Sequence, residues 1–496
     1  MMKKNEVVWY SQHTRQAPIA ILLIIFSIIK SLIRTWWPFI LILIFQSNFL
    51  SPERAKILVG IVTTLVVIFS IWRYYRFYFF IEGDKLHVNS GVFTRVKLDI
   101  PFDRIQTISF EQNLIHQIFH VARLKIDTAG SSKEEFEFTA LEIDKAKELR
   151  QFILARRGHQ VIPNTKEEDS SRLMLNLEIG DLLRVGISQN HFRTTGIILA
   201  FLLGLRDRIS DSLGAKYVDQ FDSVAEQLMD NVLVYGLGLF IVILILSFFG
   251  TLVYTILRYY NLKLWKSKDG YRLESGLLNI REQAVRDQKI QIIRWVSNPI
   301  RDLFRIVQLR FYQASSSSGS SKTSMTVPGV PREHLKIILE RYFSRPVDTL
   351  VNNSHKIHHS FFIRRFIYLS LIPSLFFLAL TFLSQQLGWL ALSLTWLVVI
   401  GIFQFYLQRK WRYYINSDSL LTKYGVFERM NRALLLRKVQ GVQIRQSPYQ
   451  RRKALSTLLL HTASGDIKIP YIQLEQALRI KNFVLYKVET SRYKWM

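Results

Sequence analysis

The chain has 496 residues, of which 49% are hydrophobic and 21% are charged, and its formal net charge is +28. The absence of cysteine excludes disulfides, thiolate metal sites and thiol nucleophiles, and it fits soluble parts that face a reducing interior. Basic charge alone does not predict a nucleic-acid partner, because membrane proteins with positive internal loops are basic for a different reason. We therefore expect no nucleic-acid partner.

The apolar residues form long runs, which predict membrane spans. Two shorter runs, Trp36–Leu50 and Thr194–Leu205, each precede a clear span and predict the first member of a hairpin. We expect Pro18–Ile33 to be an interfacial lead-in, with Trp36 and Trp37 at headgroup depth. The sequence therefore predicts six transmembrane helices in three hairpins. The four clearest runs carry no charge and approach the length that crosses a bilayer: Ile57–Ile71, Val232–Leu257, Phe366–Leu383 and Trp389–Leu407.

The charges between the runs predict the orientation. Residues 258–365 contain 20 basic and 8 acidic side chains, and residues 408–496 contain 18 and 5. The loop at 206–230 has the opposite balance, with 3 basic and 6 acidic side chains. Because positive flanks stay cytoplasmic, we expect a multi-pass protein of the cell membrane with both termini and all soluble domains in the cytoplasm. Residues 72–187 are balanced, with 17 charges of each sign.

The predicted organisation alternates hairpins with soluble domains. An N-terminal segment with the first hairpin is followed by a domain, a linker, a second hairpin and domain, and a third hairpin with its lead-in and domain. The boundaries, in the same order, are 1–72, 73–160, 161–186, 187–257, 258–345, 346–407 and 408–496.

The first soluble domain shows alternating apolar and polar residues over several short segments, and then a helical pattern. The helix contains Leu141, Ala146, Leu149 and Ile153, and the third domain repeats it after Pro470. A run of antiparallel strands closed by one C-terminal helix predicts an α+β fold, either a half-open β-barrel or an orthogonal sandwich. The expected strands are Lys85–Val88, Val92–Ile100, Ile105–Phe110, Leu124–Ile126 and Glu135–Phe138.

The three domains are copies of one unit, because the same residues recur at fixed spacing. A glutamine follows a glycine by 15 residues in each copy, an alanine follows the glutamine by 23, and an aspartate precedes the glycine by 7. The glycine predicts a tight turn with positive φ. The repeated residues are Gly91, Gly276 and Gly425; Gln106, Gln291 and Gln440; Ala129, Ala314 and Ala463; and Asp84, Asp269 and Asp418.

These motifs resemble the bacterial pleckstrin-homology-like (PH-like) domain family. The resemblance rests on the Gly91-Val92-Phe93 type of turn, the Arg104-Ile105-Gln106 type of strand and the final hairpin, and it covers essentially the whole chain. It implies a PH-like barrel in each unit and a plasma-membrane location. It also implies a role in envelope stress or in resistance to membrane-active peptides, with a short single-domain relative as a plausible partner. The second copy departs most, with Leu277-Leu278 after its glycine.

Basic residues after the glutamine strand are the candidate binding residues for anionic lipids or acidic partners. In the third copy they form a compact insert, and in the second copy they are spread over the same region, whereas the first copy has His116 and His120 there. A solvated, generally inside-positive face explains the same pattern, and both interpretations stay open at this point. The candidates are Arg445, Arg451, Arg452 and Lys453, with Arg294, Arg301, Arg305 and Arg310.

Other motifs favour structural roles. A strand glutamine kept through triplication predicts a role in the fold, and the strand Asp103–Phe110 is a candidate edge for a partner strand. His355, His358 and His359 have helical i, i+3, i+4 spacing, but no carboxylate accompanies them, so we expect no metal site and no cofactor. We expect Ser315–Ser321 to be a long loop.

The chain lacks the motifs of a nucleophile elbow, a phosphate loop or a zinc peptidase, which predicts a protein that is not an enzyme. Its clearest spans also lack ionisable residues, which disfavours an ion path. The sequence therefore favours a membrane-embedded binding or scaffolding protein that recognises lipid headgroups or protein partners. The alternative is an accessory or component of a transport or export system.

Overall fold

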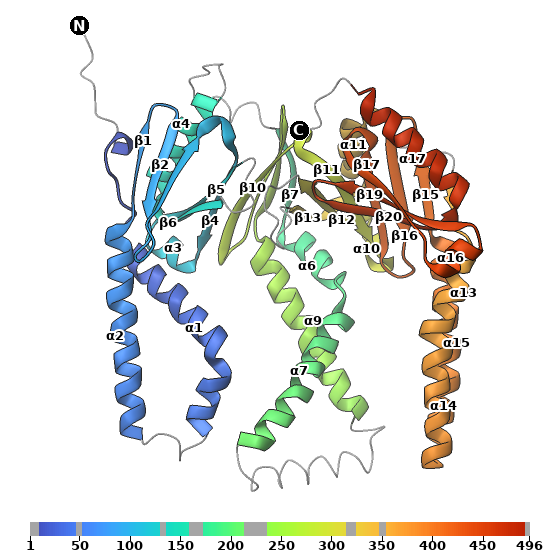
Figure 1. Ribbon diagram of the computed structural model, residues 1–496. Helices are drawn as coiled ribbons and strands as arrows, with labels where there is room; N and C mark the ends of the chain where they lie inside the picture. The colour runs from blue at the N-terminus through green and yellow to red at the C-terminus, as the bar shows by residue number, and fades with distance from the viewer. Residues whose placement is uncertain are drawn as a thin grey trace. The chain divides into compact units, whose positions relative to one another are not determined.

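A computed structural model describes residues 9–45, 52–128, 135–157, 172–212, 236–313, 324–346 and 354–491 (Figure 1). The chain divides into two compact units, each described by itself. The first contains residues 1–169, 178–262 and 274–283, and the second contains residues 170–177, 263–273 and 284–496. The first soluble domain and the first two hairpins lie in the first unit, and the third hairpin and third domain lie in the second.

The first domain consists of two antiparallel three-strand groups and a C-terminal helix. The first group is β1 (Tyr78–Glu82), β2 (Lys85–Ser90) and β3 (Val96–Pro101). The second is β4 (Ile105–Asn113), β5 (Val121–Thr128) and β6 (Glu135–Glu142), with the short helix α3 (Leu114–Ile118) between β4 and β5. Helix α4 (Ile143–Arg157) buries Ala146, Leu149 and Ile153 against both groups. The predicted terminal helix is therefore confirmed, whereas the predicted strand Val92–Ile100 begins only at Val96.

The later copies repeat this order of elements. The second copy has β8 (Leu262–Ser267), β9 (Gly270–Ser275), β10 (Asn279–Arg286), β11 (Ile290–Ser297), α10 (Pro299–Leu303), β12 (Ile306–Gln313), β13 (Ser324–Pro331) and α11 (Arg332–Phe343). The third has β15 (Arg412–Ile415), β16 (Ser419–Tyr424), β17 (Arg429–Leu435), β18 (Val439–Arg445), α16 (Pro448–Arg452), β19 (Leu455–Thr462), β20 (Gly465–Gln473) and α17 (Leu474–Glu489). A 3-10 turn joins the two strand groups of each copy, at Phe102–Arg104, Asp287–Lys289 and Leu436–Lys438.

The segment before each hairpin returns to the domain that follows the hairpin. After the 3-10 turn Trp9–Ser11, Thr14 forms a β-bridge with Phe79 of β1. In the second unit, β7 (Arg172–Leu177) lies beside β8, and β14 (Ser354–Lys356) pairs with β15. These segments cover the outer edge of the first strand group. His355 belongs to β14, opposite Tyr413, and His358 and His359 follow the strand, so the i, i+3, i+4 spacing of the three histidines does not place them on one helix.

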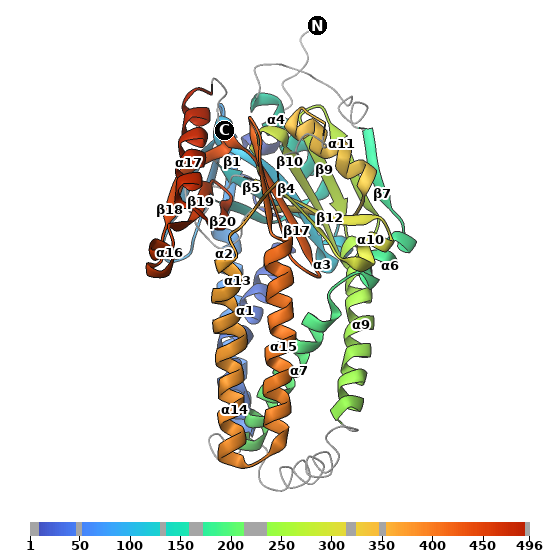
Figure 2. The same ribbon diagram turned by 90° about the vertical axis from the view of Figure 1, so that its right-hand side faces the viewer.

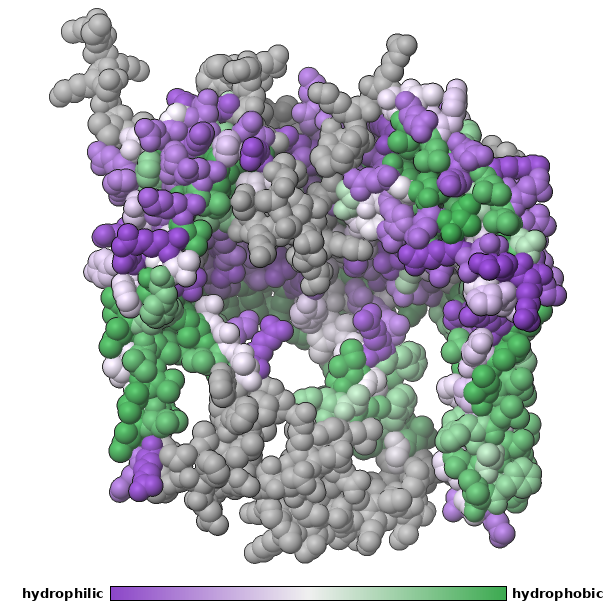
Figure 3. All heavy atoms as spheres, in the orientation of Figure 1, coloured by the Kyte–Doolittle hydropathy of each residue, from purple (hydrophilic) through white to green (hydrophobic). Residues whose placement is uncertain are grey.

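Four helical segments are long and apolar enough to cross a membrane within the described residues: 57–76, 237–259, 360–384 and 387–410. They correspond to α2 (Pro52–Arg76), α9 (Leu237–Tyr259), the series α13 (Ser360–Phe366), a π turn (Ile367–Leu371) and α14 (Ile372–Ser384), and α15 (Leu387–Lys410). Figure 3 shows apolar side chains covering α2, α14 and α15. Helix α1 (Ala20–Phe45) runs through most of the predicted lead-in Pro18–Ile33 and the first ten residues of the predicted span Trp36–Leu50, whose last five residues are outside the described part. Helix α7 (His191–Ser212) contains the predicted span Thr194–Leu205, and α6 (Ile179–Ile187) precedes it.

Polar contacts hold the third hairpin together. Helices α14 and α15 lie side by side (Figure 2), and Ser374 Oγ lies 2.9 Å from Ser393 Oγ. Pro373 has no N–H for the carbonyl of Leu369, and Trp396 Nε1 donates to that carbonyl oxygen at 3.0 Å. A carbonyl left free within a bilayer is costly, so this bond explains how the π turn is tolerated.

Candidate functional site

The repeated glycines form tight turns that contact the second helix of their own hairpins. Gly91, Gly276 and Gly425 have φ values of 98°, 115° and 111°, which confirms the predicted positive φ. After the turn, Phe93 stacks on Phe69 of α2 with ring centroids 6.0 Å apart. Phe427 stacks on Phe403 of α15 at 6.1 Å. The second copy, which lacks this aromatic residue, instead donates Leu277 N–H to the carbonyl of Leu257 at 2.9 Å.

The repeated glutamines occupy β-bulges. The strand register shifts between Ile105 and Thr107, between Ile290 and Ile292, and between Val439 and Gly441. Gln291 is fully buried and Gln440 is exposed, while the side chain of Gln106 is outside the described part. The common feature is therefore the backbone, not a shared side-chain environment. Ala463 lies in the turn before β20, and Ala129, Ala314 and Ser315–Ser321 are outside the described residues.

Each insert after the glutamine strand folds into one short helix with an N-cap seven residues after the glutamine. The side chains of Asn113, Asn298 and Ser447 accept hydrogen bonds from the backbone N–H three residues later. Ten residues after each glutamine lies a buried polar residue: His116, Arg301 and Gln450, at 1%, 5% and 5% exposure. The candidate Arg301 is therefore an interior side chain, whose Nη1 donates to the carbonyl of Val296 at 3.5 Å.

The basic insert of the third copy lies beside the start of the third hairpin. Arg451, Arg452 and Lys453 are exposed on or next to α16, and Arg445 is exposed at the end of β18. The N-cap Ser447 accepts a hydrogen bond from Arg364 Nη1 of α13 at 3.1 Å, which joins the insert to the hairpin. In the second copy, Arg305 is exposed after α10, and Asp302 pairs with Arg332 and Arg429.

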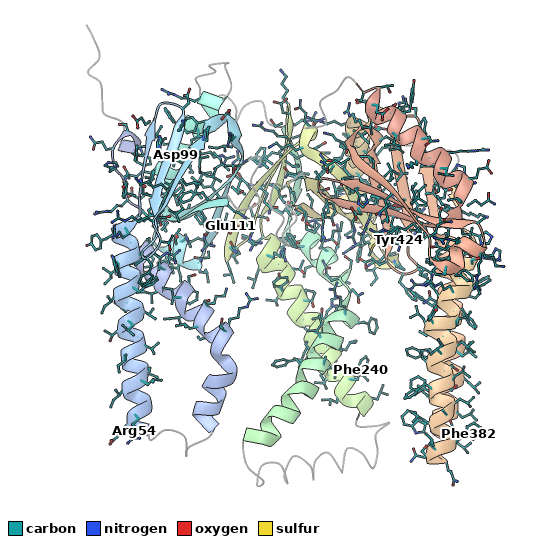
Figure 4. The ribbon with its side chains drawn as sticks, in the orientation of Figure 1. Arg54, Asp99, Glu111, Phe240, Phe382 and Tyr424 are labelled. Carbon is teal, nitrogen blue, oxygen red and sulfur yellow. The ribbon has the colours of Figure 1, made fainter. Side chains whose placement is uncertain are left out.

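A pocket of about 520 Å³ lies where the third hairpin meets the third domain. Arg364, Arg365, Arg432 and Lys468 contribute to its lining, with aromatic side chains from both the hairpin and the domain. Tyr424, marked in Figure 4, is one of these, and the Arg432 guanidinium lies 5.7 Å from its ring centroid. The described lining contains no aspartate or glutamate, so the cations share a cavity without acidic partners.

Two polar atoms at this pocket lack hydrogen-bond partners. Thr422 is 1% exposed, and its Oγ1 has no partner within the described structure. Nε of Arg432, which lies opposite Thr422 across β16 and β17, is also buried without one. Buried polar groups are normally satisfied, so these two atoms have hydrogen-bonding capacity left for a polar group in the pocket.

Arg432 also belongs to a row of three arginines across neighbouring strands. Arg294 lies opposite Arg432 on one side and Arg310 on the other. Both Arg294 and Arg310 donate to Tyr312 Oη at 3.4 Å. Directly opposed like charges are unfavourable, and no carboxylate pairs with these three in the described part of the chain. The row therefore creates a strongly positive strip that leads to the pocket.

The positive strip changes the pKa of Tyr312. Burial acts to raise the pKa of its hydroxyl, but the hydrogen bonds and charges of Arg310 and Arg294 outweigh burial and lower the pKa below its usual value. The same field would favour any other anion placed beside the arginines.

Arg364, Arg365, Arg432 and Lys468 were not among the residues predicted from the sequence. Arg364 and Arg432 are 68 residues apart, and on β17 Arg432 shares its face of the sheet with the core residue Leu434. Only Arg294 and Arg310 of the predicted candidates reach the arginine row, whereas Arg445, Arg451, Arg452 and Lys453 remain on the surface. Within the described residues there is no group of three or more His, Asp or Glu side chains that could hold a metal ion.

The comparisons with known proteins agree with the repeat and with the spans. Residues 19–157, 224–345 and 368–488 match a family described as bacterial PH domain. The chain is also 25% identical over 480 residues to the UPF0699 transmembrane protein YdbT of Bacillus subtilis (strain 168), across 92% of this chain and 94% of the relative. Three matches to one domain confirm the threefold unit. Neither description names a reaction.

Proposed function

This chain belongs to the bacterial PH domain family, and we propose that it is a membrane-embedded binding protein whose third domain holds an anionic lipid headgroup. One observation carries the proposal. Four cations surround a carboxylate-free pocket at the start of a hairpin, and Thr422 Oγ1 and Arg432 Nε are buried there without hydrogen-bond partners in the described structure.

A phosphodiester fits this set of donors. Guanidinium groups present planar N–H pairs that match phosphate oxygens, and the buried hydroxyl of Thr422 adds a second kind of donor. Part of the apolar lining, including Phe361 and Leu369, comes from the start of the hairpin. A lipid bound there would keep its acyl chains along the hairpin and its phosphate among the cations. The exposed cations on α16 would add weaker attraction of about 1 kcal/mol each near an anionic surface.

The proposed architecture follows the repeat. We propose six spans in three hairpins, a PH-like barrel in each unit, and both termini and all three domains in the cytoplasm. Loop 384–388, which carries no charge, and the acidic loop 206–230, against the basic second and third domains, support this orientation. Because the spans hold each domain at the bilayer, weak contacts act at high effective concentration. We further propose that the protein is a scaffold that binds membrane lipids and a protein partner, such as a short single-domain relative. This scaffold would act in envelope stress or in resistance to membrane-active peptides. It includes no catalytic step.

The test compares two double variants of equal charge in the full-length protein. Arg432→Gln with Lys468→Gln alters the pocket, and Arg451→Gln with Arg452→Gln alters the surface of α16. Each protein is placed in phosphatidylcholine nanodiscs, and phosphatidylglycerol is titrated while native mass spectrometry counts retained lipid. A charge-assisted hydrogen bond contributes about 1.5–3 kcal/mol, so we expect the pocket variant to lose affinity by at least tenfold.

The surface variant should retain the tightly bound lipid, with a smaller loss that high salt abolishes. Equal losses in the two variants would show general electrostatics and reject the pocket. Inorganic phosphate that displaces the lipid at low concentration would assign the site to a free anion instead of a headgroup.

A further inference from the structure

Successive domains of this chain are joined by one kind of strand pairing. In the first unit, β4 of the first domain pairs antiparallel with β10 of the second copy. In the second unit, β11 of the second copy pairs with β17 of the third. The second strand group of one copy is thus continued by the first group of the next. Strand β4 contains most of the segment that the sequence marked as a candidate edge.

Both pairings use the same register. Asn113 stands seven residues after Gln106, and its partner Asn279 stands twelve before Gln291. Ile292 stands one residue after Gln291, and its partner Leu434 stands six before Gln440. In each junction the partner lies five residues farther from its own glutamine than the first residue lies from its glutamine, so the two junctions have the same register. Because the register is the same although the paired sequences differ, it is a property of the repeated domain.

Side chains add to these junctions. Arg150 of α4 forms an ion pair with Glu282 of β10 at 2.6 Å, and both side chains are largely buried. Ile292 packs into the core of the third domain although it belongs to the second copy. The pairings therefore combine backbone hydrogen bonds with specific contacts.

The same pairing leaves one strand open at each end of the series. Strand β3 is the counterpart of β10 and β17, and it is the last strand of its three-stranded sheet. Strand β18 is the counterpart of β4 and β11, and it is also terminal. Within the described strands, neither has a neighbour on that side. Figure 4 marks Glu111 on the paired β4 and Asp99 on the open β3.

We propose that β18 of one copy pairs antiparallel with β3 of a second copy of this chain, in the register of the internal junctions. That register places Gly441 opposite Ile100 and Arg445 opposite Val96. A second copy is the fitting occupant because each copy offers both complementary edges and already uses this pairing twice. Repetition of the contact links copies head to tail, as an open array or a closed ring within one membrane.

The composition of the two edges is compatible with this register. Val96 is 50% exposed on β3. Lys97 and Asp99 lie opposite Ile444 and Val442, so no like charges are opposed, unlike the Arg294–Arg432 pair at an existing junction. Pro101, which has no N–H to donate, falls outside the paired residues. Charged residues on an edge disfavour indiscriminate pairing, so Lys97 and Asp99 restrict the edge to a partner in register.

Disulfide trapping tests the proposal, because the natural chain has no cysteine. Full-length Val96→Cys with one affinity tag is co-expressed with full-length Arg445→Cys carrying another tag, and the membranes are oxidised. Directly opposed residues have Cα atoms about 4.5–5.5 Å apart, within reach of a disulfide. The expected product is a dimer that carries both tags. The matched control pairs Lys97→Cys with Arg445→Cys, which lie on opposite faces and should form at least tenfold less product.

A positive control places both cysteines in one chain, as Glu111→Cys with Arg281→Cys, across the existing β4–β10 pair. If this disulfide forms and the two-tag dimer does not, the proposal is overturned. Equal dimer yields from the Val96 and Lys97 variants also overturn it, because they indicate random collision. If a single chain that carries both Val96→Cys and Arg445→Cys forms the disulfide only within itself, the pairing is intramolecular and the proposal of a second copy is overturned. Lipid binding in the third domain is measured separately and does not depend on this result.

Discussion

Helices α3 and α16 occupy the same place in the first and third copies but expose opposite chemistry. Leu114, Ile118 and Phe119 are 48%, 69% and 49% exposed on or next to α3. The exposed residues of α16 and its C-cap are Pro448 and three cations, Arg451, Arg452 and Lys453. Each helix nevertheless adjoins its own hairpin, since Ile115 packs against the buried cluster of Leu23 and Ala20, and Ser447 binds Arg364.

The difference shows that the three copies kept a common frame, meaning the N-cap, the buried polar residue and the positive-φ position, while their exposed residues changed. The N-cap, the buried polar residue and the positive φ at His120, Arg305 and Ala454 recur at the same repeat positions. Apolar side chains at a bilayer edge favour insertion between headgroups, whereas cations favour anionic headgroups. The second copy is intermediate, with exposed Ile300 and Leu303 beside exposed Arg305.

The largest expected effect tests whether the frame is shared. Gly91→Ala and Gly425→Ala each place a Cβ about 2 Å from a backbone oxygen, at 1.9 Å from Thr94 and 2.0 Å from Glu428, with φ positive. We expect each to destabilise its own domain by at least about 2 kcal/mol. Hydrogen exchange of peptides from each domain, in the full-length protein, measures the loss. Gly388→Ala, with no atom within 4 Å of the new Cβ, is the neutral control. Unequal losses at Gly91 and Gly425 would contradict a common frame.

A smaller effect separates the two inserts by pH. Burial lowers the pKa of His116, and its Nε2–H donates to the carbonyl of Thr139 at 2.9 Å. Because the pKa is lower in the folded state, the unfolded state binds the proton first as pH falls below about 6.5, and stability decreases from there downward. Its counterpart Gln450 does not titrate. We expect severalfold faster exchange, corrected for the intrinsic rate, at α3 but not at α16 between pH 7.5 and 5.5.

His116→Gln is the control, since glutamine stands at this repeat position in the third copy. The variant should remove the pH response of α3 while keeping the helix. A response that persists in the variant would assign the effect to another group.

Much of the frame could be predicted from sequence because it depends on local rules. Spacing revealed the three copies, a glycine indicated each turn, and a change of period located the terminal helix. The shared N-caps and the polar residue ten positions after each glutamine were also available from a comparison of the repeats. That comparison would have placed Arg301 with His116 and Gln450, in the interior.

The pocket and the junctions could not be predicted in the same way. Arg432 occupies a strand position that other residues use for the core, and only the fold brings it near Arg364. The bulges at Gln106, Gln291 and Gln440 depend on strand partners that are distant in sequence. Strand β14 is only three residues long, too short to produce a periodic signal in the sequence.

The smallest effect on stability tests the comparison at the surface. Ile118→Cys and Arg452→Cys, each the only cysteine in its chain, carry an environment-sensitive fluorophore in nanodiscs with spin-labelled lipid as quencher. Both positions are exposed, so we expect stability changes within about 0.5 kcal/mol. The label at 118 should be quenched in neutral and anionic lipid alike, because apolar insertion does not depend on charge. The label at 452 should be quenched more in anionic lipid, and salt near 1 M, where charges are screened beyond about 3 Å, should abolish that difference. If both labels respond to lipid charge in the same way, the inserts have diverged in sequence without diverging in their contact with the membrane.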